Sequence, residues 1–126
     1  MLGHVSFGVG DLARAKTFYD AIMGALGYAC VYADDRFVGY GMPGSSDDKL
    51  LLRAVSEARA PGDGFHLCFD ASDEAAVDRF HAAGMAAGGA DNGAPGLRPR
   101  YGPDYYAAFL IDPDGHHLEA KVAVRG

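Results

Sequence analysis

The chain has 126 residues and a mass of 13.2 kDa, which is a common size for one domain. Its composition, with 49% hydrophobic and 22% charged residues, is that of a globular protein and excludes a disordered one. Seventeen acidic and eleven basic residues give a net charge of −6, which argues against a protein that binds nucleic acid through clustered lysine and arginine.

The first half of the chain predicts a strand, a helix and three further strands. Residues 4–9 alternate between polar and apolar side chains, which is typical of a strand with one buried face. Asp11 then provides an N-cap for a helix with apolar residues at helical spacing, which ends near Gly27. Turn-rich sequence separates three short candidate strands, expected at residues 28–33, 36–42 and 49–55.

The second half of the chain begins the same pattern again. A shift of 62 residues places His4 on His66 and Phe18 on Phe80, and Ser72 or Asp73 would cap the second helix. A glycine-rich connection is expected after this helix, and the tight-turn sequence at 112–115 separates the last two strands. The later segments are predicted as a connection at 84–96, an extended stretch at 98–100 and strands at 105–111 and 116–124.

This repetition predicts an α+β fold built from two βαβββ modules within a single domain of residues 1–126. The first module is expected to cover residues 1–58 and the second residues 65–126. A stretch at 59–64 that contains proline and glycine is interpreted as the linker between them.

The sequence also indicates the cellular compartment. No stretch approaches the run of about 18 apolar residues that spans a membrane, and the N-terminus does not resemble a signal peptide. Cys30 and Cys68 have no spacing typical of a metal site or of a disulfide framework, so reduced thiols are expected. We therefore expect a cytoplasmic protein that has no membrane or nucleic-acid partner.

Polar residues occupy the strand faces that the helices do not need to cover. His4 lies on such a face of the first strand, His66 on the corresponding face of its repeat, and Glu119 on that of the last strand. If the two modules pair so that these faces line one cavity, the three side chains converge. Two imidazoles and a carboxylate are the ligands of open divalent metal sites. A single strand histidine is more often a surface or satisfied residue, and Cys68 is interpreted as a core filler rather than a ligand.

Two motifs resemble those of the vicinal oxygen chelate superfamily, which is also called the glyoxalase/bleomycin resistance/dioxygenase superfamily. They are HVSFGVGDLARAKTFY at residues 4–19 and DPDGHHLE at residues 112–119, and YYAAF at residues 105–109 resembles a glyoxalase-like subgroup. The resemblance covers nearly the whole chain. It implies that the two modules form a cupped mixed sheet.

The resemblance also implies a set of metal ligands. In metal-using members the ligand positions correspond to His4, His66 and Glu119 of this sequence. Enzymes of the glyoxalase I type use a fourth ligand, which also transfers a proton, on the last strand of the first module. That strand reads KLLLR at residues 49–53 and has no carboxylate or imidazole. Extradiol dioxygenases and fosfomycin-resistance transferases typically carry a tyrosine where this chain has Phe109.

We therefore expect a glyoxalase-like enzyme that uses a divalent ion (Fe, Ni, Zn or Mn) on a small oxygenated substrate. Its reaction is of the lyase, isomerase or dioxygenase type, and a true glyoxalase I is not expected. The alternative is a metal-free protein of the bleomycin-resistance type, which binds and sequesters a small molecule. A homodimer is expected, because superfamily members commonly form one. The candidate site residues, besides the three ligands, are Tyr105 and Tyr106 for catalysis and Arg98, Arg100, Tyr101 and His117 for substrate binding.

Overall fold

The computed structural model describes residues 1–124 and contains two modules of identical topology. In each of them a strand is followed by a helix and three more strands. The elements are β1 (Val5–Val9), α1 (Leu12–Ala25), β2 (Ala29–Ala33), β3 (Phe37–Gly41), β4 (Leu50–Ala54), β5 (Leu67–Ala71), α2 (Glu74–Ala86), β6 (Ala90–Leu97), β7 (Tyr106–Ile111) and β8 (His117–Val122). The predicted α+β fold of two βαβββ modules is therefore confirmed.

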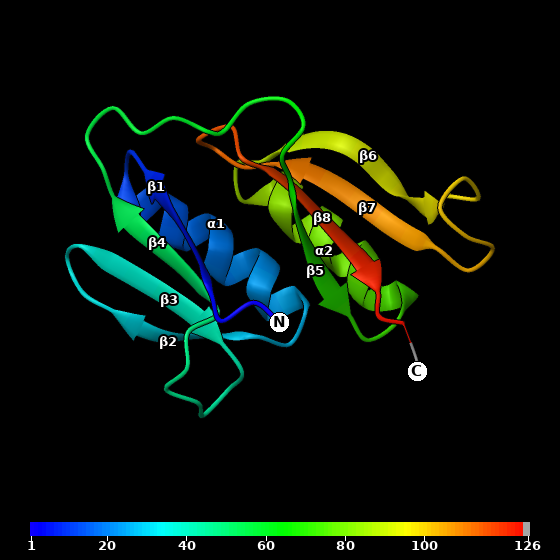
Figure 1. The fold of residues 1–126 in the computed structure, drawn as a ribbon, viewed down its shortest axis with the longest axis horizontal. Coiled ribbons are helices and arrows are strands. Elements are labelled where there is room, and N and C mark those ends of the chain that lie inside the picture. Colours follow the sequence, from blue (N-terminus) through cyan, green and yellow to red (C-terminus); the bar gives the residue numbers. More distant parts are fainter. Residues whose placement is uncertain (125–126) are drawn as a thin grey trace.

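Each module forms its own mixed sheet, and the two sheets lie side by side (Figure 1). The strand orders are β1-β4-β3-β2 and β5-β8-β7-β6, so β1 and β5 are corresponding edge strands. β1 pairs parallel with β4, and β5 pairs parallel with β8. The helices α1 and α2 pack on each other and cover one face of the sheets. The opposite faces therefore remain open for a site.

The two helices begin where the capping residues predict. Asp11 accepts a hydrogen bond from the backbone N–H of Arg14 at 3.0 Å, and Asp73 accepts one from that of Ala76 at 2.8 Å. Each carboxylate satisfies one of the backbone donors that an N-terminal turn leaves free. Of the two alternatives for the second cap, Asp73 is the correct one.

Among residues 1–124 no helix has the length and apolar character needed to cross a membrane.

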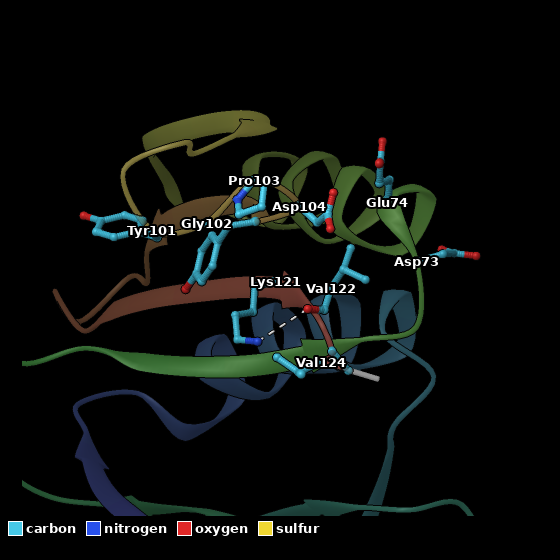
Figure 2. A pocket seen from close by; sticks show the side chains of 11 residues that line it. Asp73, Glu74, Tyr101, Gly102, Pro103, Asp104, Lys121, Val122 and Val124 are labelled. Carbon is cyan, nitrogen blue, oxygen red and sulfur yellow. Dashed lines mark hydrogen bonds between the residues drawn. The ribbon is translucent and has the colours of Figure 1, made fainter. Parts of the chain in front are cut away.

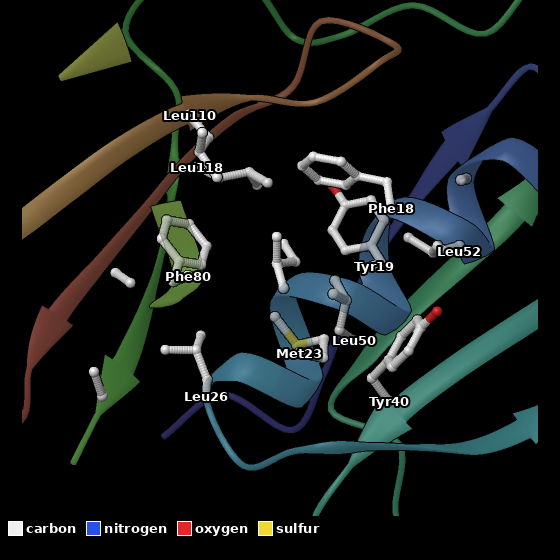
Figure 3. Packing of buried hydrophobic residues seen from close by; sticks show 14 of the residues in the cluster. Phe18, Tyr19, Met23, Leu26, Tyr40, Leu50, Leu52, Phe80, Leu110 and Leu118 are labelled. Atoms are coloured by element: carbon white, nitrogen blue, oxygen red, sulfur yellow. The ribbon is translucent and has the colours of Figure 1, made fainter. Parts of the chain in front are cut away.

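The hydrophobic core lies between the helices and the two sheets (Figure 3). Apolar residues of one helix stripe meet the alternate residues of the strands beneath, which is the pattern expected for a covered sheet face. Gly84 marks the closest approach of α2 to its surroundings. A Cβ atom there would overlap Leu110 Cδ1 and lie 3.2 Å from Ile22 Cγ2. Fully buried members of this core include Phe18, Tyr19, Ile22, Leu52, Phe80, Leu110 and Leu118.

Replacing Gly84 by Val is expected to lower the free energy of unfolding by about 1–3 kcal/mol, because the added methyl groups have no space in a close-packed core. The matched substitution is Gly24→Val on α1, where an added Cβ meets no atom within 4 Å. It is expected to change the free energy by less than about 0.5 kcal/mol. Urea denaturation of both variants measures the difference, and equal midpoints would contradict a tight contact at Gly84.

The connection predicted at 84–96 is the part of the fold that the sequence analysis assigned wrongly. Residues 90–97 form β6, whereas the stretch at 98–100, expected to be extended, belongs to the turn that follows. The register of β6 against β7 shifts between Asp91 and Gly93 and again between Gly93 and Gly96. These bulges and Pro95 remove the alternation that identifies a strand. An edge strand tolerates both because one of its sides has no ladder to maintain.

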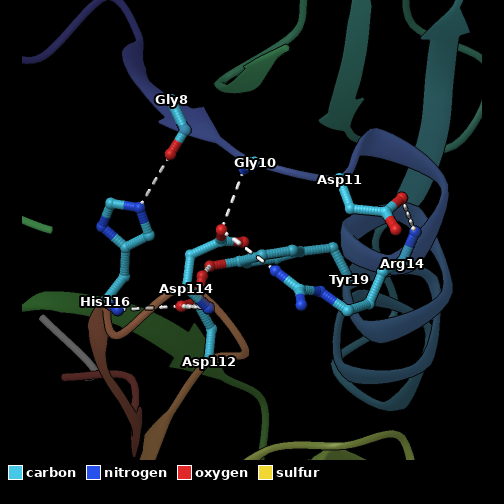
Figure 4. A network of polar contacts seen from close by, with 8 residues as sticks. All are labelled: Gly8, Gly10, Asp11, Arg14, Tyr19, Asp112, Asp114 and His116. Atoms are coloured by element: carbon cyan, nitrogen blue, oxygen red, sulfur yellow. Dashed lines mark hydrogen bonds and ion pairs between the residues drawn. The ribbon is translucent and has the colours of Figure 1, made fainter. Parts of the chain in front are cut away.

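A network of hydrogen bonds joins the turn between β7 and β8 to the first module (Figure 4). We call it the turn network; it comprises Asp112, Asp114 and His116 with Gly8, Gly10, Arg14 and Tyr19. The buried Asp112 accepts a hydrogen bond of 2.6 Å from the Tyr19 hydroxyl. Asp114 accepts one from the Gly10 N–H at 2.9 Å and forms an ion pair with Arg14 at 3.2 Å.

His116 belongs to the same network and is buried, with 3% of its surface exposed. Its Nε2 lies 3.0 Å from the Gly8 carbonyl oxygen, and its ring centroid lies 4.0 Å from that of Phe7. His116 is thus a buried residue that links the two modules. The contacts hold the start of β8 in a fixed position relative to β1, and β8 carries Glu119.

Candidate functional site

The Glu119 carboxylate is the centre of the candidate site. It lies in β8 on the face opposite α2, between Leu118 and Ala120, whose side chains enter the core. Only 3% of its surface is exposed. One oxygen, Oε1, lies 2.8 Å from Nε2 of His66, and the other, Oε2, accepts a hydrogen bond of 2.6 Å from the Tyr105 hydroxyl. Both oxygens of a buried carboxylate are thus satisfied by the protein.

The sheet register explains why these side chains meet. Glu119 of β8 lies directly opposite Cys68 of β5 and Phe109 of β7. His66 comes two residues before Cys68 and therefore lies on the same face. Tyr105 precedes β7, and its side chain reaches back over that face to the carboxylate. The structure therefore brings His66 and Glu119 together on one face of the second sheet.

The polar groups around Glu119 keep their protons. Desolvation and the hydrogen bond to Glu119 raise the pKa of the Tyr105 hydroxyl above its usual value. Desolvation and the same carboxylate raise the pKa of the Cys68 thiol to about 12. At neutral pH both groups are therefore neutral, and the thiol is a weak ligand, since metals bind the thiolate. The ammonium of Lys121 lies 5.5 Å from the centroid of the Tyr105 ring.

His4 lies apart from this centre within one chain. It is exposed and lines a cleft of about 410 Å³ between the N-terminal segment and β5, whose lining also includes Cys68 and Asp70. Within residues 1–124 of a single chain, no three histidine, cysteine or carboxylate side chains gather closely enough to hold one metal ion. The structure thus brings together two of the three predicted ligands.

The structure divides the other predicted residues between two sides of the second sheet. Tyr105 lies at Glu119, and His117, two residues before Glu119 in β8, lies on the same face. Tyr106 lies on the other side, where its hydroxyl donates a hydrogen bond of 2.6 Å to Asp78 of α2. That hydrogen bond raises the pKa of Tyr106 to about 12. Tyr106 therefore does not contact the centre formed by Glu119.

Two cavities lie near this centre, and neither is lined by Glu119 itself. The loop that precedes β7 and the end of β8 border a cavity of about 640 Å³, to which Tyr101, Tyr105 and Lys121 contribute (Figure 2). A smaller cavity of about 330 Å³ is lined by Arg98, Arg100, Tyr101 and Phe109. Four of the side chains predicted for catalysis or substrate binding thus line a cavity beside the centre. Cavities of this size accommodate a small molecule rather than a polymer.

Comparison with known proteins identifies the family. The sequence profile of the Glyoxalase/Bleomycin resistance protein/Dioxygenase superfamily matches residues 1–120. The chain belongs to this superfamily. The resemblance of the motifs at residues 4–19 and 112–119 is therefore confirmed. Members of the superfamily often use divalent metal ions, and their modules commonly pair in dimers. No curated protein sequence matches the chain.

Solved structures of the superfamily share the whole fold. A glyoxalase/bleomycin resistance protein from Albidiferax ferrireducens T118 is 35% identical, with a TM-score of 0.84, over 96% of this chain and 98% of that one. A glyoxalase-related enzyme from Fulvimarina pelagi is 23% identical, with a TM-score of 0.75, over 98% and 88% of the two chains. A fosfomycin resistance protein from Mesorhizobium loti is 21% identical, with a TM-score of 0.68, over 98% and 92%. The last two show the fold alone.

Proposed function

We propose that this superfamily member is a metal-dependent, glyoxalase-like enzyme that acts on a small oxygenated substrate. The observation that carries the proposal is the contact between His66 and Glu119, whose Nε2 and Oε1 atoms lie 2.8 Å apart. Bonds of about 2.0–2.2 Å from one ion to nitrogen and oxygen ligands place neighbouring ligand atoms about 3 Å apart. The two side chains therefore fit adjacent ligand positions of one divalent ion.

The surroundings of the pair suit an open site of this kind. The buried Glu119 carboxylate brings negative charge into a place with little water, where a cation is the favourable partner. Tyr105 donates to the second oxygen, Oε2, and so fixes the orientation of the carboxylate, as supporting groups do for metal ligands. A bound divalent ion would supply Lewis acid chemistry, which stabilises negative charge on a substrate oxygen.

We further propose that the third ligand is His4 of a partner subunit. The side chain of His66 is 50% exposed, so the site is open on one side. β1, which follows His4, and β5, which follows His66, are both edge strands. In a dimer with twofold symmetry, β1 of each chain could lie beside β5 of the other and complete two equivalent sites. The turn network and the packing of α1 on α2 join the modules of one chain in a fixed arrangement.

A metal-free binding protein is the second candidate. One observation favours it, namely that His66 and Tyr105 already satisfy both oxygens of Glu119 without an ion. In that case the cavities beside Glu119 would hold a small molecule that is sequestered rather than converted. The lyase, isomerase and dioxygenase reactions all belong to the first candidate. The identity of the ion helps to distinguish them, because two histidines and a carboxylate are typical ligands of the Fe(II) in oxygenases.

Metal analysis of the purified protein tests the proposal. We expect about one divalent ion per chain when the protein is prepared without chelator or nickel resin. Replacing His66 by Ala is expected to abolish binding, because two remaining ligands hold the ion too weakly. His81→Ala is the matched control, since His81 pairs with Asp91 at 2.8 Å, away from the site. Unchanged metal content in His66→Ala would contradict the proposed site at His66. No metal in the wild type after loading would favour the metal-free candidate.

A further inference from the structure

Arg98 is held in a fixed position beside the candidate site. Its two terminal guanidinium nitrogens donate hydrogen bonds of 2.9 Å to the Gly96 carbonyl oxygen and 2.7 Å to that of Ala94. Its guanidinium carbon lies 5.4 Å from the centroid of the Phe109 ring. A long side chain fixed by backbone acceptors on one side and an aromatic face on the other loses little conformational entropy on binding.

The backbone of β6 is shaped around this guanidinium. Gly93 has a φ of +151°, and a Cβ atom there would lie 3.0 Å from Phe109 Cδ1 and 3.1 Å from the Arg98 guanidinium. A Cβ at Gly96 would lie 3.4 Å from the same group. The bulges of β6 occur at these glycines. Bulges of this kind re-aim side chains next to functional sites.

The charge of Arg98 has no counterion in the part of the chain that the structure describes. No carboxylate of residues 1–124 lies within 4.0 Å of its guanidinium, whereas Arg14 pairs with Asp114. A guanidinium carries five N–H donors, and the two carbonyl contacts leave donors free for a ligand. The cavity of about 330 Å³ that Arg98 lines has a second arginine, Arg100, and no acidic residue in its wall. In a chain of net charge −6, this is a local concentration of positive charge.

The cavity adjoins the centre formed by Glu119 through two aromatic contacts. The Phe109 ring, over which Arg98 lies, contacts the ring of His66. The two ring centroids are 6.4 Å apart. Tyr101, which also lines the cavity, lies 5.3 Å from the ring of Tyr105, whose hydroxyl binds Glu119. These rings therefore form a continuous path from Arg98 toward Glu119, along which a small molecule would extend.

We propose that Arg98 binds a carboxylate group of the ligand, so that the ligand is a small carboxylic acid with further oxygens directed toward Glu119. A planar carboxylate matches the fork of N–H groups on a guanidinium and forms charge-assisted hydrogen bonds with it. Calling that ligand a substrate rests on the function proposed above. Binding of the carboxylate itself does not, because Arg98 is held by β6 and Phe109 and not by the ligands of an ion.

Nuclear magnetic resonance of the metal-free protein, labelled uniformly with nitrogen-15 so that arginine side chains and backbone amides are both observed, tests the proposal. Acetate is the probe, acetamide its neutral counterpart and inorganic phosphate a second anion, all at constant ionic strength. Acetate is expected to shift the Arg98 Nε–H signal in a saturable manner, and acetamide is not. Arg98→Ala should weaken acetate binding roughly tenfold or more, as measured by the signals of Gly93 and Gly96. Arg98→Lys keeps the charge but loses the fork, and an intermediate affinity is expected.

Arg36→Ala is the matched control, because Arg36 also lies over an aromatic ring, 5.8 Å from the centroid of Phe37, but in the first module. It should bind acetate as the wild type does. Equal shifts with acetamide, or unchanged acetate binding in Arg98→Ala, would overturn the proposal, and tighter binding of phosphate than of acetate would overturn the carboxylate assignment. Metal content is measured in parallel, so that the two proposals are tested separately. A loss of metal confined to His66→Ala supports the proposed metal site, and a loss of acetate binding confined to Arg98→Ala supports the carboxylate site at Arg98.

Discussion

A mixture of His4→Ala and His66→Ala chains, neither of which binds metal alone, is expected to recover about one quarter of the wild-type metal sites. If a site takes His4 from one chain and His66 with Glu119 from the other, a dimer of the two variants has one intact site and one that lacks both histidines. Random exchange makes about half of the dimers mixed, so one site in four is complete. If all ligands came from one chain, no site would be complete.

The measurement is metal content per chain after subunit exchange, followed by removal of free ion. A mixture of the two variants before exchange provides the baseline, which should contain no metal. A mixture of His81→Ala and His66→Ala is the matched control and should retain the metal of its His81→Ala chains alone. Zero recovery in exchanged dimers would contradict the contribution of His4 by a partner. A light-scattering mass near that of one chain would contradict the homodimer itself.

Most of the fold was predictable because each element carries its own local signal. The alternation in β1, the caps at Asp11 and Asp73 and the tight turn at 112–115 are determined by nearest neighbours in the sequence. Repetition of the same order in the second half then indicated the module topology. β6 was missed because its identity depends on pairing with β7 rather than on its own residues. Glycine, proline and bulges remove the alternation of polar and apolar residues from β6, so its strand conformation depends on tertiary contacts.

The candidate site was predictable only as far as it depends on strand faces. His66 and Glu119 lie on neighbouring strands of one sheet, so alternation and register place them together. His4 precedes β1 of the other sheet, and the relation between two sheets follows from side-chain packing that no pattern in the sequence describes. Tyr105 and Tyr106 show the same limit at finer scale, since one residue of register decides which of them faces Glu119.

The turn network was missed for a related reason. The turn at Asp112 was identified from its residue types, but its carboxylates could have faced solvent, as most do. Burial of Asp112 and His116 follows from their contacts with Tyr19 and Gly8, about a hundred residues away along the chain.

Little or no isomerisation of the hemithioacetal of methylglyoxal and glutathione is expected from this protein. That reaction moves a proton between adjacent carbons and needs a base within hydrogen-bond reach of the substrate. The strand that supplies this base in glyoxalase I corresponds to β4, where Leu51 lies between Ser6 of β1 and Gly39 of β3 in the sheet register. Leucine cannot accept a proton, and loss of a positioned base typically costs about 10²–10⁴ in rate.

The assay loads the protein with Ni, Zn, Mn and Fe(II) in turn and follows formation of S-lactoylglutathione, with an authentic glyoxalase I measured beside it. The rate should fall below that of the reference enzyme by about 10²–10⁴ or more with every ion. Efficient turnover with any of them would show that another group supplies the base. Glu57 is then the first residue to test by Glu57→Gln, because it follows β4 closely and its positive φ of 58° places it in a tight turn. A rate that Glu57→Gln leaves unchanged would direct the search to His117, which shares the face of Glu119.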